Sequence, residues 1–155
     1  MKRILIAVMA LTVAVSMSAC NNQSVDISNA SASDIASTIK ESVSFVDDML
    51  EVSDEVVNDF YSLPDGVTEM KVYMSSSGAT AEELAIFKCD NTETAEAVIK
   101  ACEMRVEALK EKFEDYIPGE IDKIENAIIQ KRDCFIMFAC VNDTAPAEAS
   151  FENYK

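Results

Sequence analysis

The sequence reads FIMFACV from residue 135 to residue 141, seven consecutive apolar residues. A half-exposed strand alternates apolar and polar side chains, whereas a strand that is apolar on both faces belongs inside a sheet. We therefore expect a central strand here, with helices covering one side of the sheet and part of the other. Residues 127–131 are its expected hairpin partner, with the turn at Arg132-Asp133.

A second pair of strands is expected earlier in the chain. Met70, Val72 and Met74 alternate with Lys71, Tyr73 and Ser75, which is typical of a half-buried strand, and residues 83–89 form an apolar second strand. Residues 76–79 connect the two as a hairpin. The sequence thus predicts a four-stranded, mainly antiparallel sheet made of two hairpins.

One long helix and several short ones are expected to pack on this sheet, so the fold class is α+β. From Thr92 to Tyr116 apolar residues recur three or four positions apart, with charges of both signs on the opposite face. The short helices are predicted from Ser33 or Asp34 through Val46, from Ser53, over residues 120–125 and after Pro146.

The N-terminal segment has the layout of a secretory signal, because the basic pair Lys2-Arg3 precedes an apolar run over residues 4–15. Ser18-Ala19 then leads directly into Cys20, which resembles the lipobox of bacterial lipoproteins with Met17 in place of the usual leucine. In such proteins the chain is cut between Ala19 and Cys20, and the Cys20 thiol carries a diacylglyceryl group.

Two other interpretations of this segment are possible on chemical grounds. An uncleaved membrane helix needs about 20 apolar residues, and residues 4–19 are too few. An ordinary cleaved signal would leave Cys20 as a free thiol. We favour lipidation, and expect a signal peptide over 1–19, a lipidated tether and flexible linker over 20–33, and a single globular domain over 34–155 on the extracytoplasmic face of the cell membrane.

The charge of the chain argues against nucleic acid as a partner. Without Lys2 and Arg3, 11 basic residues face 28 acidic ones, a formal charge of −17. Phosphate backbones are bound by clustered Lys and Arg, and a negative field of this size repels them and anionic lipid head groups. We expect a solvated acidic surface, with membrane contact made through the lipid anchor.

Catalytic chemistry is narrowly bounded by the absence of histidine from the sequence. Ser-His-Asp and Cys-His nucleophiles and imidazole metal ligands are excluded, which leaves carboxylate or lysine chemistry. Adjacent acids stand at Asp47-Asp48, Asp54-Glu55 and Glu82-Glu83, and a glycosidase needs two carboxylates facing across a cleft. Chance adjacency explains these pairs among 28 acids, so we assign no catalytic residue.

Residues 90–96 are the candidate calcium loop, because oxygen-bearing side chains occupy alternating positions. The segment lacks the glycine at its sixth place, and Ala101 stands where a bidentate glutamate should close the loop. Helix capping explains the segment better. We therefore expect neither a metal site nor a cofactor.

Four cysteines follow Cys20: Cys89, Cys102, Cys134 and Cys140. They show no CxxC spacing, which argues against a zinc knuckle or a redox pair. Cys134 and Cys140 lie about 20 Å apart along one strand and cannot bridge each other. A disulfide that involves Cys89 or Cys102 stays open, although four small buried side chains are the favoured interpretation.

Several short motifs together resemble those of a known family. The run GATAEELAIFK at residues 78–88 is followed by Arg105 in the long helix, FEDYIP at 113–118 and ENA at 125–127. Together these resemble an uncharacterised family of bacterial lipoproteins, catalogued as domain of unknown function 4358, over roughly Asp34 to Asp143. The resemblance implies a single extracytoplasmic domain on a lipid anchor and no known activity. Arg132-Asp133 departs from it, since a glycine is expected at this turn.

The function expected from the sequence is therefore a non-enzymatic binding or accessory role, with an unidentified cell-envelope protein or small ligand as partner. The alternative is a carboxylate-dependent hydrolase or carbohydrate-active enzyme at the cell surface, which would place two acids face to face. An assembly role is the third candidate, and an exposed apolar strand edge or helix face would mark it.

Overall fold

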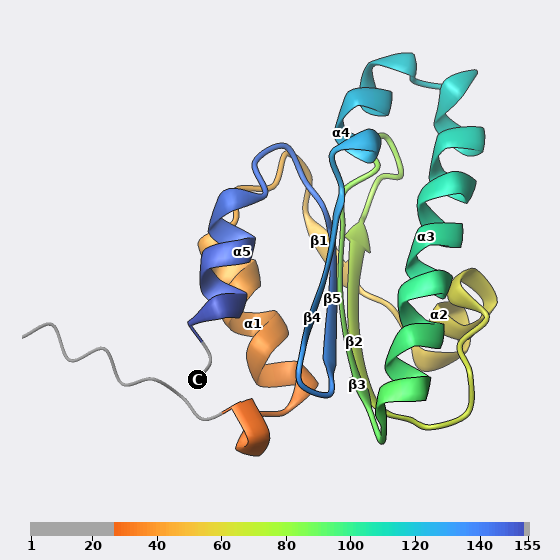
Figure 1. Ribbon diagram of the computed structural model, residues 1–155. Coiled ribbons are helices and arrows are strands. Elements are labelled where there is room, and N and C mark those ends of the chain that lie inside the picture. The colour runs from red at the N-terminus through yellow and green to blue at the C-terminus, as the bar shows by residue number, and fades with distance from the viewer. Residues whose placement is uncertain (1–26, 154–155) are drawn as a thin grey trace, which may run out of the picture.

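In the computed structural model, which describes residues 27–153, a five-stranded antiparallel sheet lies between two layers of helices (Figure 1). The strands are β1 Met49–Glu51, β2 Val67–Ser75, β3 Glu83–Cys89, β4 Ile128–Arg132 and β5 Phe135–Cys140, in the spatial order β1-β2-β3-β5-β4. The helices are α1 Ala32–Ser42, α2 Asp54–Tyr61, α3 Thr92–Glu114, α4 Ile121–Glu125 and α5 Ala145–Glu152, with short 3-10 turns η1 Ile27–Asn29 and η2 Pro118–Glu120.

The apolar run at residues 135–141 forms a central strand, β5, as the sequence predicts. β5 pairs with β3 on one side and β4 on the other, and all six of its residues are buried. Both predicted hairpins, β2-β3 and β4-β5, are confirmed. At the β4-β5 turn Asp133 takes a φ of 52°, a left-handed conformation that glycine adopts most easily and that aspartate tolerates.

The α+β class is confirmed, but the sheet has five strands and not four. The missed strand, β1, is three residues long and pairs with the end of β2, with Leu50 opposite Met74. Only its first residue is buried, so the strand shows no apolar alternation that a sequence reading can detect.

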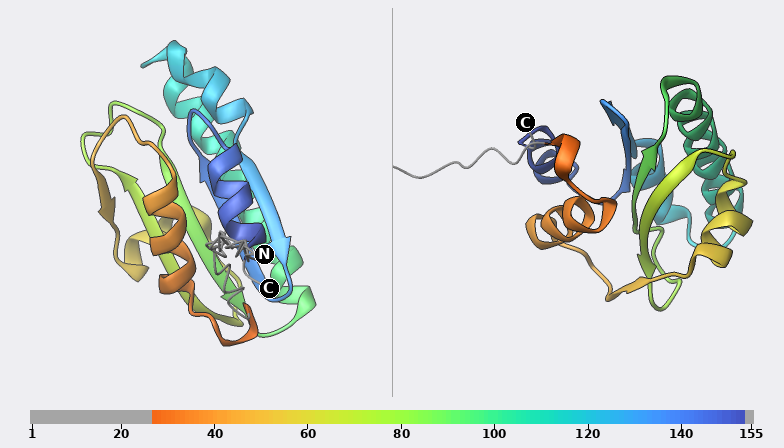
Figure 2. Two further views of the ribbon diagram at one scale, coloured as in Figure 1. Left: turned by 90° about the vertical axis from the view of Figure 1, so that its left-hand side faces the viewer. Right: turned by 90° about the horizontal axis from the view of Figure 1, so that it is seen from below.

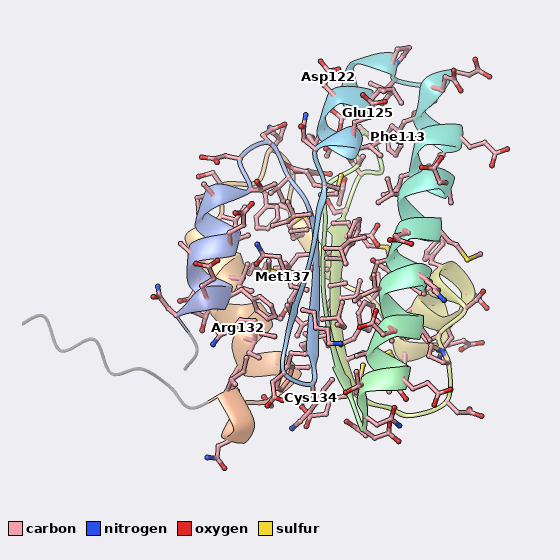
Figure 3. All side chains as sticks on the ribbon, in the orientation of Figure 1. Phe113, Asp122, Glu125, Arg132, Cys134 and Met137 are labelled. Carbon is pink, nitrogen blue, oxygen red and sulfur yellow. The ribbon has the colours of Figure 1, made fainter. Side chains whose placement is uncertain are left out.

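Helices cover both faces of the sheet, more completely than expected (Figure 2). Alternate residues of β5 point to opposite layers. Phe135, Met137 and Ala139 pack against α1 and α5, whereas Ile136 and Phe138 pack against α2, α3 and α4. Figure 3 shows Met137 between the sheet and the α1–α5 layer.

The packed part of the chain begins upstream of Asp34, where we expected the globular domain to start. Ser31 caps α1 through a capping box with Asp34, and Ile27 and Ala30 are buried against the sheet. The backbone N–H of Ala32 also donates to the carboxylate of Glu69 at 2.9 Å. Residues 27–33 therefore belong to the fold and not to a linker. Val46, expected on the buried face of this helix, follows it and is exposed.

The long helix is confirmed, with small changes at its ends. Asn91 and not Thr92 is the N-cap, since its side chain accepts from the backbone N–H of Thr94. Tyr116 lies beyond the last residue of α3 and is exposed.

Replacement of a buried aromatic side chain in the central strand by alanine should destabilise the fold far more than the same replacement at the surface. Phe138 is fully buried, so Phe138→Ala should lower the free energy of unfolding by about 3–5 kcal/mol, through lost burial and a residual cavity. Tyr116→Ala, the matched control at a residue 67% exposed, should cost less than about 0.5 kcal/mol. Denaturant unfolding measures both, and similar losses would contradict the central position of β5.

Candidate functional site

Glu83, the first residue of β3, is a buried carboxylate paired with Arg105 of α3. The Nε of Arg105 donates to both carboxylate oxygens at 3.1 and 3.2 Å, and its Nη2 donates to Oε2 at 2.7 Å. The hydroxyl of Tyr61, at the end of α2, also donates to Oε1. These hydrogen bonds join the sheet to α2 and α3, two of the three helices that cover this face.

Burial and charge keep both donors protonated. Burial, with the Glu83 charge beside it, raises the pKa of Tyr61 well above its ordinary value. Burial alone would lower the pKa of Arg105, but attraction to Glu83 outweighs it and raises the pKa. The Glu83 carboxylate therefore faces one cation and one neutral hydroxyl.

A cavity of about 250 Å³ opens beside this ion pair, and we name it the Arg105 cavity. Its walls come from the residue after β1, from α2, the end of β2, the β2-β3 loop, the start of β3 and α3. Six of its lining residues carry apolar side chains: Val52, Phe60, Met74, Ala81, Leu109 and Phe113. Two cations, Arg105 and Lys112, and two carboxylates, Glu82 and Glu83, also line it. A mostly apolar hollow with a few polar groups is the usual form of a small-ligand site.

Exposed apolar side chains stand at this part of the surface. Phe60 is 47% exposed, and its ring lies 4.4 Å from the guanidinium carbon of Arg105. Leu50 is 57% exposed, and it lies opposite Met74 on the edge strand. These residues are the exposed apolar edge that the sequence could not locate.

The β2-β3 loop, which forms one wall of the cavity, is held by three carboxylates. Asp47 accepts from the hydroxyls of Ser75 and Ser77 and from the N–H of Ser77, which lowers its pKa well below the usual range. Glu82 accepts from the N–H groups of Val46 and Asp47 at 2.9 and 3.1 Å. These bonds tie the loop to the segment between α1 and β1.

Glu120 holds the other side of the loop. Its carboxylate accepts from the Thr80 hydroxyl at 2.8 Å, the Ala81 N–H at 2.7 Å and the Lys123 amino group at 2.8 Å. Burial would raise the pKa of Glu120, but these bonds outweigh it and lower the pKa. The β2-β3 loop is therefore held by η2 on one side and by the segment between α1 and β1 on the other.

The adjacent acids predicted from the sequence do not meet across a cleft. Glu82 turns to the segment after α1, whereas Glu83 turns to α2 and α3. Asp54 and Glu55 are exposed in the first turn of α2, where the helix dipole favours negative charge. Asp47, in the segment between α1 and β1, accepts hydrogen bonds from Ser75 and Ser77 at the β2-β3 connection.

The candidate calcium segment caps α3. Asp90 accepts from the Thr94 hydroxyl at 2.8 Å and Asn91 accepts from the Thr94 N–H at 2.9 Å. Within residues 27–153 no three His, Cys, Asp or Glu side chains gather closely enough to hold a metal ion.

The anchor predicted at Cys20, and the cleavage after Ala19, lie outside the residues that the structure describes. Across the described helices, none combines the length and the apolar character that a bilayer span requires. The cysteines at 89, 102, 134 and 140 are free thiols, and Cys134 alone of these four is partly exposed, at the β4-β5 turn (Figure 3).

Arg105 is the site residue that sequence reasoning did not assign. It stands three positions after Cys102 and four before Leu109, so it occupies the apolar stripe of α3. A charged residue in such a stripe signals a buried partner. The spacing alone does not identify the partner of Arg105 among the 28 acidic residues of the sequence.

Loss of one partner of the ion pair should be costly, and loss of both much less so. Glu83→Gln leaves the guanidinium buried without its counter-charge and should lower the free energy of unfolding by about 3–5 kcal/mol. Glu83→Gln combined with Arg105→Met should recover most of that loss, because no unpaired charge remains. Denaturant unfolding of both variants tests this, and a double variant as unstable as the single one would contradict it.

Thiol reactivity should follow burial. Burial raises the pKa of Cys89 to about 11 and of Cys140 to about 12, and raises that of Cys102 further. In a Cys20→Ala chain at about pH 8, a disulfide reagent should label Cys134 first and the other three only on unfolding. Cys134→Ser should remove the fast phase. Rapid labelling of Cys102 or Cys140 in the folded protein would contradict the packing.

The comparisons with known proteins identify a family but no activity. The family model described as Domain of unknown function (DUF4358) matches residues 41–141, which include Glu83, Arg105 and the β2-β3 loop. No curated protein and no solved structure matches the chain. The model covers well over half of the 155 residues. The chain belongs to the family described as Domain of unknown function (DUF4358).

Proposed function

We propose that this chain is a membrane-anchored extracytoplasmic lipoprotein whose globular domain has a non-enzymatic binding or accessory role. The anchor rests on the sequence at residues 17–20, which lies upstream of the family match. The binding role rests on one observation, the Arg105 cavity with its apolar walls and exposed apolar rim.

The position of the cavity suits a tethered domain. Cys20 is seven positions from Ile27, so the anchor holds η1 within about 25 Å of the bilayer. The β2-β3 loop at the cavity lies at the opposite end of the sheet from η1 (Figure 1). The 23 residues of α3 span about 35 Å between these ends. An anchored domain can therefore hold the cavity away from the membrane.

The enzymatic alternative needs two carboxylates that act on one substrate bond. The two acids that line the Arg105 cavity already accept hydrogen bonds, Glu83 from Arg105 and Tyr61, and Glu82 from two backbone N–H groups. No arrangement among the described residues favours hydrolysis over binding, so we favour the binding role.

The anchor can be tested by intact-mass analysis of the membrane fraction from native cells. We expect a mature species that begins at Cys20 and carries the added mass of a diacylglyceryl group, in the wild type and in the control Cys134→Ala. Cys20→Ala should lose this species, because the acceptor thiol is gone. An unmodified wild-type chain released to the medium would show that no anchor is present.

A further inference from the structure

We infer that the Arg105 cavity binds the carboxylate of a small amphipathic ligand, with its apolar part against Phe60 and Leu109. This inference rests on the proposed binding role and assigns its ligand class. The carboxylate can belong to a free organic acid or to the C-terminus of a peptide, since both present the same group.

The hydrogen bonds of Arg105 leave one donor nitrogen free. Glu83 takes Nε and Nη2, and Nη1 makes no hydrogen bond with any residue of the described chain. Every fully buried polar side-chain atom in residues 27–153 has a partner. Nη1 is therefore open to solvent at the cavity that Arg105 lines.

Lys112 brings a cation that no acid of the described chain neutralises. Its side chain lines the same cavity and is exposed, and its amino group lies 5.0 Å from the centre of the Phe113 ring. It forms no ion pair with a described residue, in contrast to Lys110 on the same helix, which pairs with Glu107 at 3.2 Å. Two donors on a guanidinium and an ammonium suit one singly charged carboxylate.

The carboxylates and the Ser75 hydroxyl that line the cavity already accept hydrogen bonds. Both oxygens of Glu83 accept from Arg105, and those of Glu82 accept from backbone N–H groups. The Ser75 hydroxyl donates to Asp47 and accepts from the Gly78 N–H. What the cavity still offers is donor capacity, which attracts an acceptor group on the ligand.

The apolar walls of the cavity favour a ligand that carries an apolar group next to its carboxylate. Val52, Met74 and Leu109 line the cavity, and Phe60 extends the apolar surface to its exposed rim. The volume of about 250 Å³ admits a small side chain and not a long polymer. The ligand is therefore a carboxylate with one compact apolar group.

The test is calorimetric titration of the mature full chain, purified in a non-ionic detergent at low salt. The probes are N-acetyl-L-leucine and its neutral amide, together with a tripeptide that ends in leucine, with a free or an amidated C-terminus. The acid should bind about tenfold or more tightly than its amide, because the charge-assisted hydrogen bonds are lost in the amide. A stronger signal from the free tripeptide would indicate a peptide terminus as the source.

Three variants locate the carboxylate. Lys112→Gln should weaken acid binding about twofold to fivefold, as expected for an exposed charge, whereas the control Lys110→Gln should leave it unchanged. Glu83→Gln with Arg105→Met should lose the preference for acid over amide. This double variant keeps the net charge of the chain, so its effect reports the guanidinium and not the long-range field.

The outcomes separate this inference from the proposed function. Equal binding of acid and amide, both weakened by Phe60→Ala, would overturn the carboxylate assignment and leave the binding role in place. Acid binding that is unchanged in Lys112→Gln and in the double variant would overturn the location. Absence of any binding at millimolar probe would overturn the ligand class together with the small-ligand form of the proposed function.

Discussion

Two neighbouring strands, β3 and β5, bury both of their faces, and water is kept from them only if helices cover the sheet on each side. The three-layer architecture follows from this constraint. The long helix α3 covers one face together with α2 and α4, while α1 and α5 cover the other. The apolar area buried by these contacts is the main stabilising contribution to the fold.

The large acidic excess is compatible with this core because the buried acids are individually neutralised or hydrogen-bonded. Glu83 faces a guanidinium, and Glu82 accepts from two backbone N–H groups. Most other acids project from helix surfaces into solvent, as in the outer face of α3. Three carboxylates, those of Asp47, Glu82 and Glu120, accept hydrogen bonds that hold the β2-β3 loop in one conformation.

The fixed conformation of the β2-β3 loop shapes one wall of the Arg105 cavity. The loop is fixed by Asp47, Glu82 and Glu120, and the opposite wall is a rigid helix, so the free donor on Arg105 is held in place before any ligand arrives. Family membership supplies no activity, and fold alone does not imply function. The binding role that we propose therefore depends on the chemistry of the Arg105 cavity.

The sequence by itself determined the two hairpins, the long helix, the α+β class and the family, because alternation and helical spacing are local patterns. It did not reveal β1, whose three residues are too few to show a period. Nor did it reveal the packing of residues 27–33, which are held by contacts with distant Glu69 and the sheet. Only the tertiary structure paired Glu83 with Arg105, since 22 positions separate them and any of 28 acids has the same chemistry in the sequence.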